Sequence, residues 1–125
     1  MKILVIGGMH GNEMLGIDLV KSLQESPLEN IDSVLANEEA IKINKRFVNQ
    51  DLNRSFPGVE SSGIYEQQRP VKLLEMCKDY DIVFDFHNTF CPDIRAAISA
   101  AEPLFPSKLI CEKEVSSNIG FRYFS

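Results

Sequence analysis

Residues 2–16 read KILVIGGMHGNEMLG, and this stretch decides the fold. Residues 2–6 are mostly apolar and β-branched, which predicts a buried strand, and the glycines that follow predict a tight turn. Leucines then recur at helical spacing at positions 15, 19 and 23, which predicts a helix from Asn12 that stops before Pro27. A buried strand followed by a helix is the first half of a βαβ unit, as parallel sheets use.

The rest of the chain continues this alternation of strand and helix patterns. Further strands are predicted at 31–37, 81–89 and 121–125, and further helices at 70–80 and 107–120. Pro70 is expected near the first turn of its helix, where its missing N–H costs little. Residues 38–65 are polar and poorly periodic, and a long segment of this kind in a compact domain usually has a functional role. The predicted fold is α/β, with a mixed, largely parallel sheet flanked by helices.

The composition excludes several classes of protein. The chain has 125 residues, enough for one domain, and its net charge of -5 argues against sequence-independent binding to nucleic acid. No apolar run approaches the ~18 residues of a membrane span, and the first apolar stretch is too short for a signal peptide. Three cysteines, Cys77, Cys91 and Cys111, form no C-x-x-C pair, so we expect free thiols in a cytoplasmic protein.

The chain's two histidines, His10 and His87, each follow a predicted strand. The carboxyl ends of parallel strands form the edge at which open α/β sheets bind ligands. Glu13 lies three residues after His10, so the two side chains can share one side of a first helical turn. Two imidazoles and one carboxylate are the ligand set of a catalytic zinc site, although a polar loop without metal explains the same residues. Asp85, on the same strand face as His87, suits a hydrogen bond to the second nitrogen of a ligand histidine.

A nucleotide-binding glycine loop is the second interpretation of the opening stretch. The sequence GGMHGNEMLG at 7–16 lacks the spacing G-x-G-x-x-G and the G-K-[ST] of a phosphate-binding loop. The acidic residue expected ~20 positions later could only be Glu29 or Asp32, and neither stands cleanly at the end of the second predicted strand. The residues therefore favour a metal site over a nucleotide site.

Polar residues within 45–58, KRFVNQDLNRSFPG, form a further candidate site. Arg46 and Arg54 can each bind a carboxylate through paired N–H donors, and Asn53 offers a donor and an acceptor to an amino-acid backbone. Asp51 lies beside them in the sequence. A solvated basic turn explains either arginine alone, but the grouping of both with Asn53 favours a site that captures a carboxylate.

Three motifs carry a resemblance to a known family: GGMHGNE at 7–13, RFVNQDLNRSFPG at 46–58 and DFHNT at 85–89. In this order they resemble the succinylglutamate desuccinylase and aspartoacylase family of zinc hydrolases, which are relatives of the zinc carboxypeptidases. The resemblance implies a zinc carboxypeptidase-like fold. It also implies that zinc-activated water hydrolyses the amide bond of a small N-acyl amino acid.

The resemblance implies a role for each residue of the metal site. The ligands of one zinc ion per chain would be His10, Glu13 and His87. Asp51 and Asp85 would be supporting groups, hydrogen-bonded behind these ligands.

The resemblance also implies roles at the substrate. Arg46 would polarise the scissile carbonyl and stabilise the developing oxyanion. Asn53 and Arg54 would hold the carboxylate of the substrate amino acid. Asn37 would shape the wall of the pocket, although Glu38 follows it where family members often have proline.

One part of the family's machinery is not found in the sequence. The mechanism needs a glutamate as general base, placed farther beyond the third motif than this chain extends. By number the nearest carboxylates are Glu102, Glu112 and Glu114, and none has the family's context. Residues 1–125 are therefore expected to be the N-terminal portion of a catalytic domain, inactive alone. A truncated sheet would expose an unpaired edge, which predicts self-association into a homo-oligomer.

Two other functions stay open on the sequence. A non-catalytic zinc- or carboxylate-binding protein would keep the ligands and need no base. A carboxypeptidase-type metallopeptidase would use the same ligands on a peptide. The sequences HGNE and DLNR favour the acylase branch, and they do so by resemblance alone.

Overall fold

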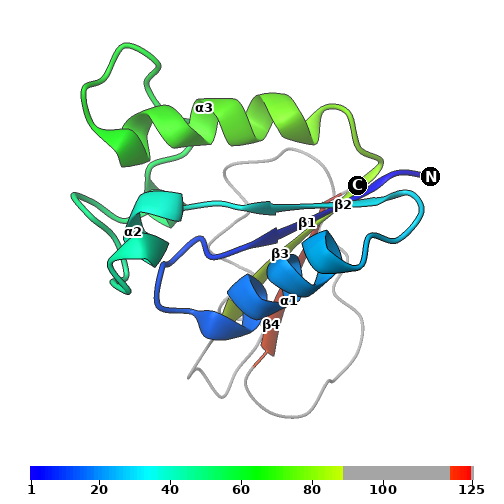
Figure 1. Ribbon diagram of the computed structural model, residues 1–125. Helices are drawn as coiled ribbons and strands as arrows, with labels where there is room; N and C mark the ends of the chain where they lie inside the picture. Colours follow the sequence, from blue (N-terminus) through cyan, green and yellow to red (C-terminus); the bar gives the residue numbers. More distant parts are fainter. Residues whose placement is uncertain (89–118, 125) are drawn as a thin grey trace.

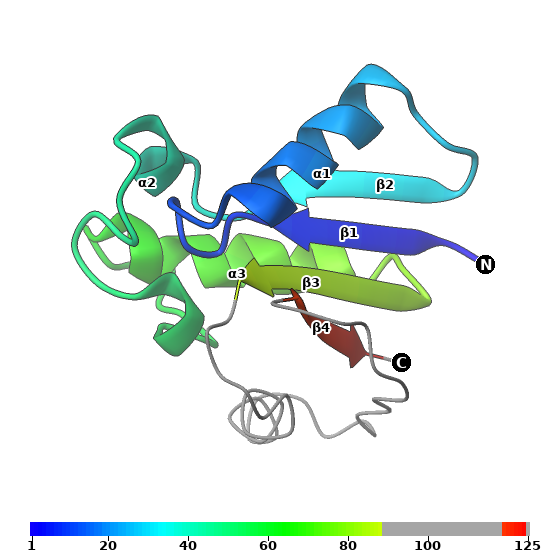
Figure 2. The same ribbon diagram turned by 90° about the horizontal axis from the view of Figure 1, so that it is seen from below.

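The described strands form one sheet, in the order β2-β1-β3-β4 (Figures 1 and 2). The computed structural model describes residues 1–88 and 119–124. The strands are β1 (Ile3–Gly7), β2 (Ile31–Leu35), β3 (Ile82–Asn88) and β4 (Ile119–Phe124). Strand β1 pairs in parallel with β2 and β3, whereas β4 pairs antiparallel with β3. The predicted mixed, largely parallel sheet is confirmed.

Helices cover both faces of this sheet. Helix α1 (Met14–Glu25) lies on one face and α3 (Tyr65–Cys77) on the other (Figures 1 and 2). Ile17 and Val20 of α1 are fully buried, because residues three apart share one face of a helix. Burial of an aliphatic side chain of this size contributes roughly 1.5–3 kcal/mol. Among the described residues, no helix combines the length and apolar character needed to cross a membrane.

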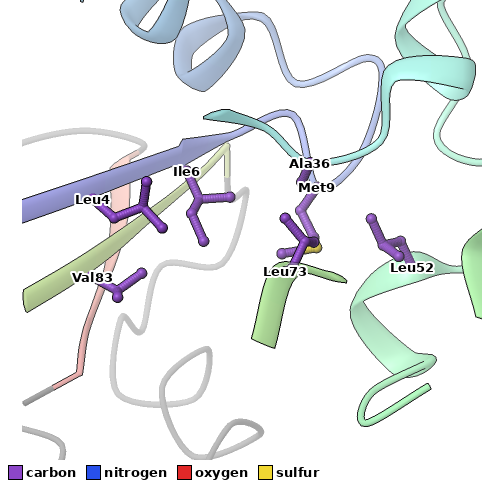
Figure 3. Packing of buried hydrophobic residues seen from close by; sticks show 7 residues of the cluster. All are labelled: Leu4, Ile6, Met9, Ala36, Leu52, Leu73 and Val83. Atoms are coloured by element: carbon purple, nitrogen blue, oxygen red, sulfur yellow. The ribbon is translucent and has the colours of Figure 1, made fainter. Parts of the chain in front are cut away.

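A core of buried apolar side chains lies between the sheet and α3 and continues under the segments that follow β1 and β2 (Figure 3). Its members are Leu4, Ile6, Met9, Ala36, Leu52, Leu73 and Val83. Met9 and Leu52 adjoin His10 and Asp51 in the sequence. The core therefore anchors the backbone on which two of the candidate site residues stand.

Helix α3 begins earlier than predicted. It starts at Tyr65 rather than at residue 70, so Pro70 lies inside the helix and not near its first turn. The prediction was wrong because the sequence YEQQR before Pro70 is rich in strong helix formers. Pro70 gives no N–H to the carbonyl one turn earlier, and its full burial offsets the lost hydrogen bond.

The polar segment 38–65 contains two short helices that were not predicted. Helix α2 (Glu38–Lys42) begins after Asn37, and the short 3-10 helix η1 (Leu52–Arg54) begins after Asp51. Each capping side chain accepts a backbone N–H from the first turn of its helix. Asparagine and aspartate are strong N-caps, so the helix starts have a local cause that hydrophobic periodicity does not reveal.

The predicted C-terminal elements lie partly outside the described residues. Strand β4 confirms the strand expected at 121–125 and begins at Ile119, so the end of the helix predicted at 107–120 is wrong. The rest of that helix, with Cys91 and Cys111, falls outside the described residues. Cys77 is a half-buried free thiol, and burial raises its pKa to about 11.

Arg69 of α3 binds the end of β2. Its Nε donates to the carbonyl of Ala36 at 2.7 Å, and its Nη2 donates to the carbonyl of Leu35 at 2.9 Å. The same Nη2 lies 3.5 Å from Glu38 Oε1. Only 14% of the Arg69 side chain is exposed, so these bonds hold the carboxyl end of β2 against α3.

Replacing Arg69 by alanine should lower the free energy of unfolding by about 2 kcal/mol, because two carbonyls lose a charged donor. Urea denaturation followed by circular dichroism measures this loss. Lys72→Ala, an exposed position on the same helix, should change the free energy by less than about 0.5 kcal/mol. Equal losses in the two variants would contradict the role given to Arg69.

Candidate metal centre

The turn after β1 carries His10 and Glu13. Gly8 adopts a φ of +70°, a conformation that strains residues with a side chain. Gly11 lies so close to α2 that a Cβ there would be 2.2 Å from the carbonyl carbon of Ala40. The Glu13 N–H donates to the His10 carbonyl at 3.1 Å, which closes the turn. Both side chains are thereby held at the carboxyl end of β1.

His10, Glu13 and His87 converge on one point. The Nδ1 of His10 lies 2.7 Å from Glu13 Oε1, and the Nδ1 of His87 lies 3.0 Å from Glu13 Oε2. One ligand atom from each residue lies within 4.8 Å of the others. Glu13 and His87 are 74 positions apart along the chain, and they meet because β1 and β3 are neighbours in the sheet.

A carboxylate faces the second nitrogen of each imidazole. His10 Nε2 lies 2.9 Å from Asp51 Oδ1, and His87 Nε2 lies 2.8 Å from Asp85 Oδ2. An Nε2–H donated to each aspartate leaves the Nδ1 lone pair for a metal, which is the usual arrangement around a zinc-bound histidine. The two aspartates thus fix the orientation of both rings.

The environment favours the charged forms of Glu13, His87 and Asp51. Burial opposes ionisation of Glu13, but hydrogen bonds from His10 and His87 outweigh it and lower the pKa of Glu13 to about 2. Burial also opposes protonation of His87, but the charges and hydrogen bonds of Asp85 and Glu13 outweigh it and raise the pKa of His87 to about 10. For Asp51, burial opposes ionisation, but the hydrogen bond and charge of His10, the charge of Arg46 and the Asn53 N–H together outweigh it and lower the pKa.

The donor set fits a zinc ion. Two imidazole Nδ1 atoms and one carboxylate are ligands that zinc takes in catalytic sites. The cluster contains three carboxylates, those of Glu13, Asp51 and Asp85. Buried charges are normally paired or bound to a metal, and a divalent cation would pair with the carboxylate of Glu13.

Two arginines stand beside this cluster. Arg46 Nη2 lies 3.4 Å from Asp51 Oδ2, and Arg54 Nε lies 4.0 Å from the same oxygen. Their side chains are 52% and 85% exposed, so both remain accessible to a ligand. The backbone N–H of Asn53 donates to Asp51 Oδ1 at 2.9 Å. Asp51 therefore joins the predicted carboxylate-binding residues to the metal cluster.

Comparison with known proteins identifies the family of this chain. Residues 1–91 match the succinylglutamate desuccinylase/aspartoacylase catalytic domain. The chain belongs to this family. The matching residues include the whole cluster, from His10 to His87.

Curated relatives carry names that agree with the desuccinylase/aspartoacylase family. The chain is 34% identical over 103 residues to a probable aspartoacylase of Trichodesmium erythraeum, a match over 70% of this chain and 35% of the relative. It is 33% identical over 104 residues to an N-acyl-aromatic-L-amino acid amidohydrolase (carboxylate-forming) of Xenopus laevis, over 70% and 34%. The chain thus spans about a third of the length of these relatives.

Solved structures from the family share the fold. Murine aminoacylase 3 aligns with a TM-score of 0.51 and 31% identity, over 61% of this chain and 29% of that chain. The succinylglutamate desuccinylase from Chromobacterium violaceum aligns with a TM-score of 0.51 and 26% identity, over 62% and 28%. The α/β fold class predicted from the sequence is therefore confirmed.

Asn37 of this desuccinylase/aspartoacylase chain is a fully buried helix cap. Its side chain accepts the Ala40 N–H at 3.1 Å, and its Nδ2 has no hydrogen-bond partner within the described part of the chain. The place in the pocket wall that the resemblance implies stays a prediction. The glutamates considered as a general base, Glu102, Glu112 and Glu114, lie outside the described residues.

Sequence reasoning missed Glu66, which contacts the segment between Arg46 and Asp51. Glu66 is fully buried in the first turn of α3 and accepts the Val48 N–H at 2.6 Å. An acidic residue is common in a first helical turn, and this signal would have placed the helix start near Tyr65. The contact itself has no signal in the sequence, because loop and helix meet only in the fold.

Proposed function

We propose that the protein contributes the zinc-binding part of a hydrolase that cleaves the amide bond of a small N-acyl amino acid. The observation that carries the proposal is the contact of both imidazole Nδ1 atoms, from His10 and His87, with the one carboxylate of Glu13. Membership of the family and the names of the relatives, a probable aspartoacylase and an N-acyl-aromatic-L-amino acid amidohydrolase, support the reaction class.

The metal ligands in this proposal are His10 and His87, through Nδ1, and Glu13, through its carboxylate. Asp51 and Asp85 accept the Nε2–H groups and keep each Nδ1 directed at the ion. When bound, zinc supplies a Lewis acid that activates water for attack on the amide.

The substrate-binding residues in this proposal lie on the segment that also holds Asp51. Arg46 stabilises the negative charge that develops on the carbonyl oxygen of the scissile amide. Arg54 and Asn53 bind the carboxylate of the amino acid, the group that a guanidinium recognises through two parallel hydrogen bonds. The exposure of both arginine side chains is consistent with binding a ligand from solution.

We expect the 125-residue chain to bind one zinc ion and to hydrolyse neither acetyl-aspartate nor succinyl-glutamate. Glu13 is the one glutamate of the described metal cluster, and as a ligand it does not serve as proton acceptor. If the gene encodes a longer form, that form should hydrolyse one of these compounds. In that form Arg46→Ala should lower kcat about 100-fold. Zinc content and release of the free amino acid are the measurements.

Three outcomes would count against parts of this proposal. Zinc-dependent turnover by the 125-residue chain would contradict the expectation that it is inactive. Glu102, Glu112 and Glu114 would then be the candidates for the general base. Absence of zinc in the wild type, with His10→Ala and His87→Ala behaving identically, would contradict the metal site. Zinc binding without turnover in every form would favour a zinc-binding protein without catalysis.

A further inference from the structure

Glu66 is a fully buried carboxylate outside the metal cluster. It is the second residue of α3, and its neighbours on that helix, Pro70 and Leu73, are also buried. Burying a carboxylate is costly unless hydrogen bonds satisfy its oxygens. The carboxylate therefore needs hydrogen-bond donors, and these come from a distant part of the chain.

Those partners are two successive backbone amides of the segment that follows α2. Glu66 Oε1 accepts the Val48 N–H at 2.6 Å and the Asn49 N–H at 3.3 Å, and Oε2 lies 3.4 Å from the same Asn49 nitrogen. Val48 stands two residues after Arg46, and Asn49 stands two residues before Asp51. The carboxylate thus holds the middle of the short span that joins these two site residues.

Both ends of this span contact the turn that carries His10. The Arg46 carbonyl accepts the Gly11 N–H at 3.2 Å, and Asp51 Oδ1 lies 2.9 Å from His10 Nε2. Arg46 and Asp51 also meet each other at 3.4 Å. A shift of the span would therefore move both Asp51, which contacts His10, and Arg46.

Apolar side chains of the span do not fix it by burial. Phe47 and Val48 are 38% and 44% exposed. Polar contacts with the backbone therefore carry much of the attachment, and those from Glu66 come from a helix that the core holds in place. Hydrogen bonds to an ionised group are stronger than neutral ones, which suits a carboxylate to this task.

We propose that Glu66 is a positioning residue, which holds the 46–51 segment so that Asp51 orients His10 and Arg46 faces the substrate. The consequence for zinc and substrate rests on the function proposed above. The hydrogen bonds between Glu66 and the segment are present in the metal-free chain. Glu66 touches neither metal nor substrate, and it acts through two backbone amides.

The test compares Glu66→Gln with Glu75→Gln in the purified protein. Glutamine keeps one acceptor oxygen and the shape of the side chain, but it turns an N–H₂ group toward a backbone N–H. Glu75 lies on the same helix with its side chain 73% exposed, so it is the matched control. Circular dichroism and the urea midpoint first establish that both variants fold.

In the metal-free protein, amide hydrogen exchange at Val48 and Asn49 should become about tenfold faster in Glu66→Gln, which is the loss of roughly one hydrogen bond. It should stay unchanged in Glu75→Gln. This measurement does not depend on zinc, so it tests the hold on the segment even if the proposed function fails. Unchanged exchange in a folded Glu66→Gln protein would overturn the inference.

With zinc, the ring signals of the two histidines give a selective readout. Glu66→Gln should shift the Nε2–H signal of His10, whose partner Asp51 lies on the held segment. The signal of His87 should not move, because its partner Asp85 lies on β3. The zinc dissociation constant should rise about tenfold, as for other groups that support a ligand from behind. Equal shifts of both rings would indicate a general loss of structure and would overturn the positioning role.

Discussion

Glu13→Gln should raise the zinc dissociation constant by more than about 100-fold. Loss of a group that only supports a ligand lowers the metal affinity about 10–100-fold, and Glu13 is proposed as a ligand itself. Its two oxygens face the Nδ1 atoms of both His10 and His87. The neutral amide of glutamine removes the negative charge and turns a donor toward one of these nitrogens. Competition with a chromophoric chelator measures the change.

The matched control for this experiment is Glu29→Gln. Glu29 is exposed and lies before β2, at the end of the sheet opposite the metal cluster. The Glu29→Gln variant should bind zinc with the wild-type affinity, whereas His10→Ala and His87→Ala should lose zinc as Glu13→Gln does. A Glu13→Gln protein that binds zinc like the wild type would show that the ion, if bound, lies elsewhere.

Gly11→Ala should lower the free energy of unfolding by about 3 kcal/mol and weaken zinc binding as well. The added Cβ would lie 2.2 Å from the carbonyl carbon of Ala40 and 2.5 Å from the backbone nitrogen of Ile41. Backbone atoms cannot rotate away as a side chain can, so α2 and the turn must separate. The displaced turn carries His10 and Glu13. Urea denaturation and the chelator assay measure the two effects.

Gly63→Ala is the matched control, because nothing lies within 4 Å of the Cβ it would add. We expect its free energy of unfolding to stay within about 0.5 kcal/mol of the wild type. If Gly11→Ala were as stable as Gly63→Ala, the close packing of the turn on α2 would not be required for folding.

Much of the fold follows from local patterns in the sequence. The apolar run of β1, the leucine spacing of α1 and the run of β3 are each strong on their own. The two histidines follow two of these strands, so the rule that ligands bind at the carboxyl ends of parallel strands points to His10 and His87. Adjacent strands β1 and β3 then bring the two rings together.

The 38–65 segment could not be predicted in the same way. Asn37, Asp51 and Glu66 fix it through hydrogen bonds from side chains to backbone groups, and such bonds leave no periodic pattern. The predicted start of α3 was wrong because proline favours the first turn of a helix, whereas Pro70 lies inside this one. The buried environment that tolerates a proline there exists only after the chain has folded.

The neighbouring strands β1 and β3 bring Glu13 and His87 together across 74 positions of the chain. An ion bound by Glu13 and His87 would cross-link the ends of these two strands. A ligand that binds only the folded state adds its binding free energy to stability, about 2.7 kcal/mol when free zinc is 100 times the dissociation constant. The concentration of free zinc around the protein would then set the fraction of the chain that stays folded.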